Sequence, residues 1–240
     1  MIAYEGPSRL DRTREIVAIV TGFSRPSQNQ KTGDLLQLWI LPADQHPAQA
    51  RAQDDERGTC GDCPLSGYGG GCYVDVGQAP AAVWRAYRAG WYDHWTPARH
   101  RERLRRSAGL RLGAYGDCSA LPARVVRELV RTHRAHCPGQ GVTGYTHQWR
   151  RSDCQWLRSY CLASCETWHD AATAAAAGWR VFHAGPIAER PAGLLQCPAD
   201  SRGITCQQCR LCDASRVARS IYIEPHGKFR SNMLRTIAAR

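Results

Sequence analysis

The sequence predicts an α/β fold, a partial or open (β/α) barrel of mainly parallel strands with an N-terminal β-hairpin and cysteine-rich metal-binding loops. From residue 110 onward, short β-rich runs alternate with helical segments, which is typical of parallel strands joined by right-handed crossovers. Before that, residues 15–22 and 35–41 are extended apolar runs separated by a polar stretch rich in turn-forming residues, and this pattern predicts a hairpin. The cysteines gather in tight groups, which favours metal-binding loops.

A chain of 240 residues is long enough to bury a substantial core without covalent cross-links. We expect a single domain over residues 1–240. Within it, residues 1–80 supply the hairpin and the first cysteine-rich loop, and residues 81–240 supply the βα-repeat barrel core and the C-terminal cysteine cluster. Residues 43–58 are polar and charged without periodicity, so we predict a surface loop there.

A helix is predicted over residues 83–95, where aromatic side chains recur every three to four positions and mark one inward-packing face. The clearest helix is 166–177, which is alanine-rich and has early acidic residues, Ser164 as a candidate N-cap and Gly178 as a stop. The remaining helices are expected over 122–136, over 214–220 and in a short basic segment at the C-terminus. Strands are predicted over 110–116, 141–147, 158–164, 179–185, 193–196 and 221–225.

Parallel sheets and barrels assemble their sites from residues at or just after the carboxyl ends of the strands. The candidates on this rim are Asp117, His147 and Glu224 as catalytic residues and Tyr115, Thr146 and Ser164 as cofactor-binding residues. Two of them have a structural alternative. His147 either contacts a ligand or transfers a proton, or it is a satisfied histidine in a capped turn. Asp117 either caps the following helix or binds a polar ligand.

The chain has 12 cysteines, and their grouping is unlike the disulfide framework of a small secreted scaffold. Its first residues lack the apolar stretch and cleavage site of a signal peptide, and no segment approaches the length needed to span a bilayer. We therefore expect a cytoplasmic protein with no membrane partner, in which grouped cysteines bind metal.

The strongest local signal is Cys206-x2-Cys209-x2-Cys212, preceded by Cys197-Pro198. Three thiolates at this spacing on a looping backbone can hold three corners of a cubane, and Cys197 would be the fourth ligand. Zinc also takes four thiolates, but its usual pattern is two separated C-x2-C pairs. A [4Fe-4S] cluster is the favoured cofactor, with zinc as the alternative metal.

The second signal is Cys60-x2-Cys63-x8-Cys72, in which a glycine-rich segment before Cys72 lets the backbone fold around a metal. A second cluster or zinc fits these three ligands. The fourth ligand is Cys118 at a predicted strand end, another cysteine, or a substrate or solvent species at an open position.

The formal net charge of +11 and the pI of about 9.3 favour a polyanionic partner. The densest basic run is 99–106, with arginines at 101, 103, 105 and 106. The run is interpreted either as a phosphate contact to DNA or RNA or as a solvated face with extra charge.

Several enzyme classes lose support from the sequence. It has no phosphate loop of the P-loop or Rossmann type and no H-E-x-x-H helix. The C-x3-C-x2-C run of radical S-adenosylmethionine enzymes is also missing, because Cys161-x3-Cys165 lacks the third cysteine. Cys137, Cys154 and Cys161 are predicted as small apolar core residues, whereas the position of Cys165 at a strand end leaves both roles open.

One ordered set of motifs resembles a bacteriophage and prophage family, the gene-product-88-like family. The motifs are Ser27-x-Asn29-x-Lys31-Thr32-Gly33 with Gln37, CGDCPL with GGCYV, GAYGDCSALP, TGYTHQW, GWRVF, and CPA followed by TCQQCRLC. The resemblance runs from residue 15 to residue 225 and implies a relation to radical-SAM-like α/β barrels and work in a bacterial host cytoplasm. The sequence has Cys118 where the pattern expects proline and Cys165 where it expects a non-cysteine residue, so neither is carried over as a family ligand.

Two functions follow as hypotheses. The first is a phage-type iron-sulfur enzyme of the redox or radical type, with one structural or electron-transferring [4Fe-4S] cluster and a second three-cysteine site. Its partners would include an electron donor protein and S-adenosylmethionine. The second is a metal-stapled protein, with iron-sulfur or zinc, that binds nucleic acid or a host factor without catalysis.

Overall fold

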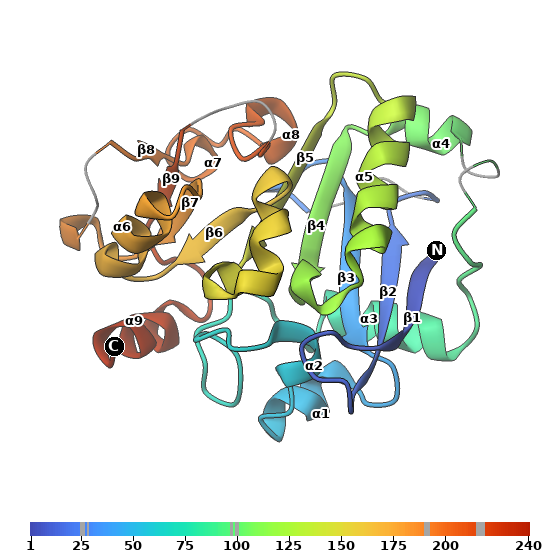
Figure 1. The fold of residues 1–240 in the computed structure, drawn as a ribbon, viewed down its shortest axis with the longest axis horizontal. Helices are drawn as coiled ribbons and strands as arrows, with labels where there is room; N and C mark the ends of the chain where they lie inside the picture. The colour runs from blue at the N-terminus through green and yellow to red at the C-terminus, as the bar shows by residue number, and fades with distance from the viewer. Residues whose placement is uncertain (25–26, 28, 97, 99–100, 190–192, 215–218) are drawn as a thin grey trace.

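A computed structural model describes residues 1–24, 27, 29–96, 98, 101–189, 193–214 and 219–240. They form a nine-stranded sheet in the order β1-β2-β3-β4-β5-β6-β7-β9-β8, with β1 and β8 as its edges (Figure 1). The strands are β1 (Ile2–Pro7), β2 (Glu15–Thr21), β3 (Leu36–Pro42), β4 (Gly109–Tyr115), β5 (Gly141–Thr146), β6 (Leu162–Cys165), β7 (Val181–Ala184), β8 (Leu195–Gln196) and β9 (Ile221–Ile223).

The α-helices are α1 (Pro47–Ala52), α2 (Arg57–Cys60), α3 (Ala79–Arg88), α4 (Arg101–Arg106), α5 (Ala123–His136), α6 (Trp168–Ala176), α7 (Pro198–Ser201), α8 (Cys206–Cys209) and α9 (Arg230–Ala238). Four 3-10 helices accompany them: η1 (Cys118–Ala120), η2 (Gln148–Arg150), η3 (Ser152–Ser159) and η4 (Ile187–Glu189). Among the described residues no helix is long and apolar enough to cross a membrane.

The predicted fold class is confirmed at the level of an α/β protein with a mostly parallel sheet. Strands β2 and β3 form the predicted antiparallel hairpin, and β1, which the sequence did not predict, pairs antiparallel with β2. From β3 to β8 every neighbouring pair is parallel. The sheet is open, because its two edge strands do not pair with each other.

One face of the sheet carries the largest apolar cluster. Alternate residues of β2, such as Ile16 and Val20, point to this face, and α5 covers it with Val126 and Leu129. The predicted core cysteines Cys137, Cys154 and Cys161 are all buried in this cluster, as is Cys165. We call this side of the sheet the helix face.

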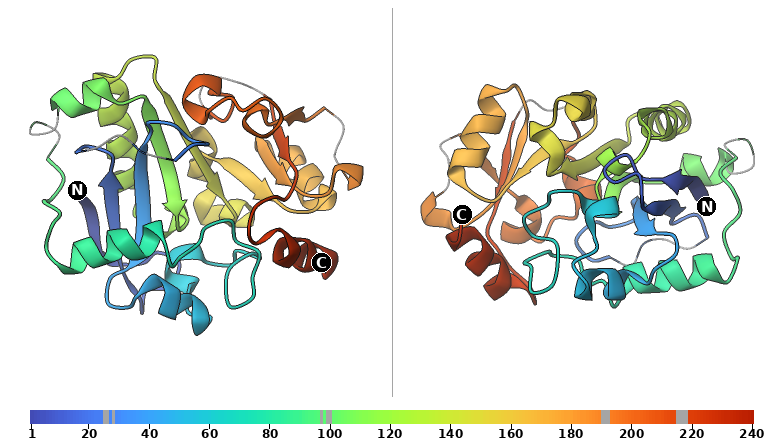
Figure 2. Two further views of the ribbon diagram at one scale, coloured as in Figure 1. Left: turned by 180° about the vertical axis from the view of Figure 1, so that it is seen from behind. Right: turned by 60° about the horizontal axis from the view of Figure 1, so that its bottom comes forward.

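The opposite face is only partly covered. Val17, Ile19 and Leu41 pack there against α3, which crosses the lower part of the sheet when the molecule is seen from behind (Figure 2). Farther along, this face is bordered by α8 above and by α9 below. We call this side the cavity face.

The last two strands reverse the order of the sheet, since β9 lies between β7 and β8. From β3 to β7 each new parallel strand adds on the same side, so right-handed crossovers place α5 and α6 on one face. From β8 to β9 the chain steps back, and the same handedness places that connection on the other face. The connection holds α7 and α8, so the C-terminal cysteines lie on the cavity face.

Several local predictions were wrong. Residues 43–58 contain α1, which starts at Pro47 with His46 as a side-chain cap, and part of α2. The helix expected over 83–95 runs from Ala79 to Arg88 and is followed by Gly90 at φ 72°, a conformation that ends helices. Trp91, expected on its inward face, is therefore 78% exposed.

Other predicted boundaries also moved. Thr167, not Ser164, caps α6, since its side chain accepts a hydrogen bond from the Asp170 amide. The strand predicted over 158–164 begins only at Leu162, because η3 occupies the preceding residues. Parts of the predicted 24–34 turn, the 99–106 basic run and the 214–220 helix lie outside the described residues, namely 25–26, 28, 99–100 and 215–218.

Candidate functional site

A cavity of about 1040 Å³ opens on the cavity face, and both cysteine groups line it. This volume is at the upper end of sites that bind small molecules. Its seven lining cysteines are Cys60, Cys63, Cys72, Cys197, Cys206, Cys209 and Cys212. Segments more than a hundred residues apart in the sequence therefore meet at one hollow, which we call the cysteine cavity.

Strand alternation decides which side chains form the floor of the cysteine cavity. On β4, Arg111 and Tyr115 point into it, while Leu110 and Leu112 point to the helix face. On β5, Tyr145 lines the cavity, and the same alternation brings His147 to its rim just after the strand. A cationic side chain and two phenols thus lie close to the thiols.

The first cysteine group, which we call the cysteine trio (Cys60, Cys63 and Cys72), follows the carboxyl end of β3. Cys60 ends α2, and its carbonyl accepts a hydrogen bond from Gln148 Nε2 at 3.1 Å. The next residue, Gly61, has φ 60°, and a Cβ there would lie 2.7 Å from that amide nitrogen, so any other residue would strain the backbone and displace the Gln148 side chain. Cys63 and Cys72 pack against an apolar cluster that includes Leu65.

A buried ion pair fixes the loop that carries the trio. The Glu56 carboxylate, 2% exposed, accepts hydrogen bonds from Arg51 Nη2 at 3.0 Å and from the Tyr115 hydroxyl at 2.7 Å. It also accepts one from the Gly67 amide at 2.7 Å, and Arg51 Nη1 donates to the Val74 carbonyl at 2.9 Å. The loop on either side of Cys72 is therefore bound to α1 and β4.

The same surroundings raise the pKa of two of the trio thiols, Cys60 and Cys72. Burial raises the pKa of Cys60 well above its usual value, and Glu56, Cys63 and Cys72 raise it further. Burial also raises the pKa of Cys72, against the opposing effect of Arg51. The three thiols lie close enough for their charges to interact, and metal binding there would release protons.

His147 lies beside the trio. Its Nε2 is 2.7 Å from Glu166 Oε1, and its ring interacts electrostatically with the Cys63 thiol. Burial alone would lower the pKa of His147, but Cys63 and Glu166 outweigh burial and raise it well above its usual value. Glu166 in turn pairs with Arg240 at 3.3 Å.

The C-terminal cysteine group, which we call the cysteine quartet (Cys197, Cys206, Cys209 and Cys212), is formed by α8 and its flanks. Thr205 and Gln208 form a capping box at the start of α8, and Arg210 at φ 57° ends it and turns the chain toward Cys212. The Cys206 amide donates to the Lys31 carbonyl at 2.9 Å, which holds α8 across the start of β3.

The quartet thiols also interact with one another and with the sheet. Burial raises the pKa of Cys212 to about 12, a hydrogen bond from Tyr145 opposes this, and Cys206, Cys197 and Cys209 raise it. Burial raises the pKa of Cys206 as well, while Arg111 lowers it. Arg111 is thus a cationic side chain of the cavity floor whose charge interacts with this group.

None of the twelve cysteines, all of which lie in the described residues, forms a disulfide. Within the described part of the chain, no three His, Cys, Asp or Glu side chains are arranged to hold a metal ion together as they stand. In donor chemistry, three and four mutually interacting thiols fit a soft metal or an iron-sulfur cluster. Binding at either group therefore requires the side chains to turn toward a common centre.

Two of the other predicted site residues, Asp117 and Thr146, are held in hydrogen bonds that stabilise the fold. Asp117 lines the cavity but is committed to structure: it accepts hydrogen bonds from the Ser119 amide, the Thr146 hydroxyl and the His147 amide, each at 2.9 Å. Asp117 caps η1, a 3-10 helix, whereas the expected cap was for the helix near Pro122. Thr146 is fully buried and bonds to Asp117.

Tyr115 and Ser164 line the cavity, and the Ser164 hydroxyl lies 3.5 Å from Glu166 Oε1. Cys118 is fully buried in the cluster on the helix face, where its thiol interacts with Cys161, so the structure does not bring it to the trio. Glu224 follows β9, and its carbonyl accepts a hydrogen bond from His226 Nδ1 at 2.8 Å.

Sequence reasoning missed three side chains of this site. Glu166 is only 1% exposed and follows β6, so a strand-end rule extended by two residues past Ser164 would have included it. Arg111 and Tyr145 lie within strands, and their direction follows from period-two alternation in LRLGAY and GVTGYT. The prediction used strand ends and neglected this alternation.

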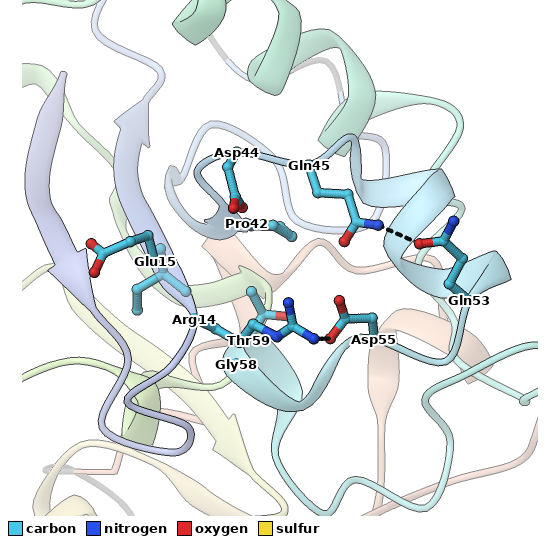
Figure 3. Close-up of a pocket in the computed structure, with 10 residues that line it drawn as sticks. Arg14, Glu15, Pro42, Asp44, Gln45, Gln53, Asp55, Gly58 and Thr59 are labelled. Atoms are coloured by element: carbon cyan, nitrogen blue, oxygen red, sulfur yellow. Dashed lines mark hydrogen bonds and ion pairs between the residues drawn. The ribbon is translucent and has the colours of Figure 1, made fainter.

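A second pocket, of about 310 Å³, lies between α1, α2 and the ends of β2 and β3 (Figure 3). Its polar side chains pair mainly with each other: Arg14 Nη2 is 3.0 Å from Asp55 Oδ1, and Gln45 Nε2 is 2.7 Å from Gln53 Oε1. Its described lining holds no thiol or imidazole, so the cysteine cavity is the stronger candidate for chemistry.

In comparisons with known proteins, no family model, curated protein or solved structure matches this chain. The candidate site therefore rests on the residues and geometry of this chain alone, and the cysteine cavity is its centre.

Proposed function

We propose that this chain is an iron-sulfur protein of the redox or radical type. The quartet would bind one [4Fe-4S] cluster, and the trio would bind a second cluster or metal. The observation that carries the proposal is the convergence of both cysteine groups on one cavity of about 1040 Å³. Two unrelated structural sites would have no reason to share a hollow large enough for a substrate.

The order of the strands supports a partial barrel. Strands β3 to β7 add one after another with α5 and α6 on the outside, and the cysteine cavity lies on the inside. The trio, Asp117 and His147 follow the carboxyl ends of their strands, where α/β barrels place their chemistry. This supports the relation to radical-SAM-like barrels that the family resemblance implies, and with it S-adenosylmethionine and an electron donor protein as partners.

An iron-sulfur cluster would supply one-electron transfer, and its potential depends on the charge and hydrogen bonds around the thiolates. The chain offers suitable groups for this. Arg111 interacts electrostatically with Cys206, and the Tyr145 phenol interacts with Cys212. Both would stabilise the added negative charge of a reduced cluster.

The test is the iron, sulfide and zinc content of anaerobically purified protein, together with its visible and electron paramagnetic resonance spectra. Two cubanes would give about eight iron and eight sulfide per chain. The double variant Cys206→Ala, Cys209→Ala should lose about half of both. A matched control is Cys154→Ala in the core, which should keep the full content because Cys154 lies on the helix face.

Zinc without sulfide in the wild-type protein would contradict the redox proposal. Loss of iron from a folded Cys154→Ala control equal to that in the double variant would also contradict it, since the loss would not depend on the quartet, whereas loss from an unfolded control would not contradict it. A melting curve for each variant, followed by circular dichroism, separates these cases.

A second candidate function is binding of nucleic acid by a metal-stapled protein. Four exposed arginines, Arg124, Arg127, Arg131 and Arg134, recur on α5 at a spacing that places them on one side of the helix. The neighbouring α4 adds exposed Arg101 and Arg105. A row of guanidinium groups on a helix is suited to phosphate contacts.

This candidate predicts binding of duplex DNA or RNA that weakens steeply with salt. Changing the four α5 arginines to glutamine should reduce the slope of log affinity against log salt by about three to four, since each phosphate contact contributes about 0.9 on B-DNA. Undetectable binding at low salt, or an unchanged slope in the variant, would exclude it.

A further inference from the structure

The structure offers a candidate for the fourth ligand of a metal bound by the cysteine trio. His147 lines the cysteine cavity together with Cys63, with which it interacts electrostatically, and its Nε2 lies 2.7 Å from Glu166 Oε1. Glu166 is 1% exposed, so its carboxylate is committed to the contacts around it. Arg240 Nη1 holds the other carboxylate oxygen at 3.3 Å.

The backbone of His147 is fixed as well. Its amide donates to Asp117 Oδ2 at 2.9 Å, and the Thr146 hydroxyl before it bonds to the same carboxylate. Both Cys63 and His147 line the cysteine cavity. The imidazole is thus held at both its backbone and its ring while it faces the thiols.

We infer that His147 is the fourth protein ligand of a metal site formed with Cys60, Cys63 and Cys72, and that Glu166 is the positioning carboxylate behind it. The inference rests on the proposed metal-binding role of the trio and concerns only the remaining ligand. Metal-bound histidines nearly always donate their other ring N–H to a carboxylate, a carbonyl or water. With Nε2–H on Glu166, Nδ1 is left for the metal.

The donor chemistry agrees with this assignment. Three thiolates and one imidazole form a common zinc site, and histidine also ligates iron in some iron-sulfur centres. An alternative role for the same residues is a catalytic thiol, Cys63, with His147 as its base and Glu166 as the group that orients the base. The two further thiols that interact electrostatically with Cys63 favour a metal. Cys118, the earlier candidate, is turned to the helix face beside Cys161.

The experiment is a titration of the full-length, reduced, metal-free chain with Co²⁺, followed by absorption of the thiolate and d–d bands. Wild-type protein should take up about two Co²⁺, since folded thiol sites bind such ions. His147→Ala should weaken one of the two sites by at least tenfold, and Glu166→Gln should weaken the same site by about 10–100-fold. His226→Ala, which alters another histidine of the cavity, should leave both sites unchanged.

His147→Cys keeps the inference testable if His147→Ala does not fold. It should retain Co²⁺ at both sites and shift the d–d bands toward those of a four-thiolate site. If His147→Ala binds Co²⁺ like wild type while Cys72→Ser loses one site, His147 is not a ligand and the trio keeps its metal role. If neither variant loses a site, the metal role of the trio fails, and the inference fails with it.

Discussion

The buried ion pair behind the cysteine trio gives the sharpest prediction about stability. Changing Glu56 to Gln removes a charge that is 2% exposed and faces Arg51, which is 14% exposed. The carboxylate accepts from Arg51, the Tyr115 hydroxyl and the Gly67 amide. A glutamine has one acceptor oxygen, so its NH₂ group must face at least one of these donors.

The cost follows from these contacts. Removing one partner of a buried pair typically costs 3–5 kcal/mol, because the other charge stays buried and unpaired. Arg51 keeps its hydrogen bond to the Val74 carbonyl and some exposure, so the lower end applies. We expect Glu56→Gln to lower the free energy of unfolding by about 3 kcal/mol.

The assay is denaturant unfolding of reduced, metal-free protein at pH 7. A lower denaturant midpoint for the variant, with the same dependence of unfolding free energy on denaturant concentration, reports lost stability. The matched control is Asp62→Asn, in the same cysteine motif. Asp62 and its partner Arg57 lie 3.5 Å apart with side chains 67% and 73% exposed. The control should change stability by less than about 1 kcal/mol. An effect of Glu56→Gln as small as that of the control would refute the reasoning.

Two further predictions concern the core and the C-terminal helix. Burial lowers the pKa of His133 from 6.5 to about 4, so the unfolded state binds more protons between these pH values and stability falls as the pH drops from 6.5 to 4. His133→Gln should remove about 3 kcal/mol of that fall, and equal pH profiles in urea unfolding would contradict the assignment. Gly71→Ala should destabilise the fold by about 1–3 kcal/mol, because its Cβ would lie 2.2 Å from Met233 Cα in α9. Gly77→Ala, whose Cβ meets only Asp75 Oδ1 at 3.4 Å, should have little effect, and similar midpoints for both variants would disprove the contact.

Local pattern determined much of this fold. The α5 helix, the β2–β3 hairpin and the strands β4, β5 and β7 lie where periodicity and turn residues predicted them. Their apolar spacing is a property of the segment itself, because one face of each element must be buried whatever it packs against. Pro47 and Gly90 are sequence signals for a helix start and a helix end, respectively, but the prediction did not use these residues.

The tertiary structure decided which segments that are distant in the sequence lie next to each other. Buried parallel strands have similar local sequence patterns whatever their position in the sheet. The sequence of a single segment therefore cannot show that β9 lies between β7 and β8. That reversal brings the quartet to the face where the trio opens. It is the reason why two cysteine groups, each recognisable from spacing alone, form one cavity.

The sequence by itself therefore determined most of the element types and the spacing of the two cysteine groups, and four of its six predicted rim residues line the cysteine cavity. It could not determine that His147 would face Cys63 and Glu166, or that Cys118 would turn into the core beside Cys161. Spacing fixes which thiols are neighbours along the chain. Which side chains from different strands become neighbours is fixed only when β4, β5 and β6 pack against their covering helices.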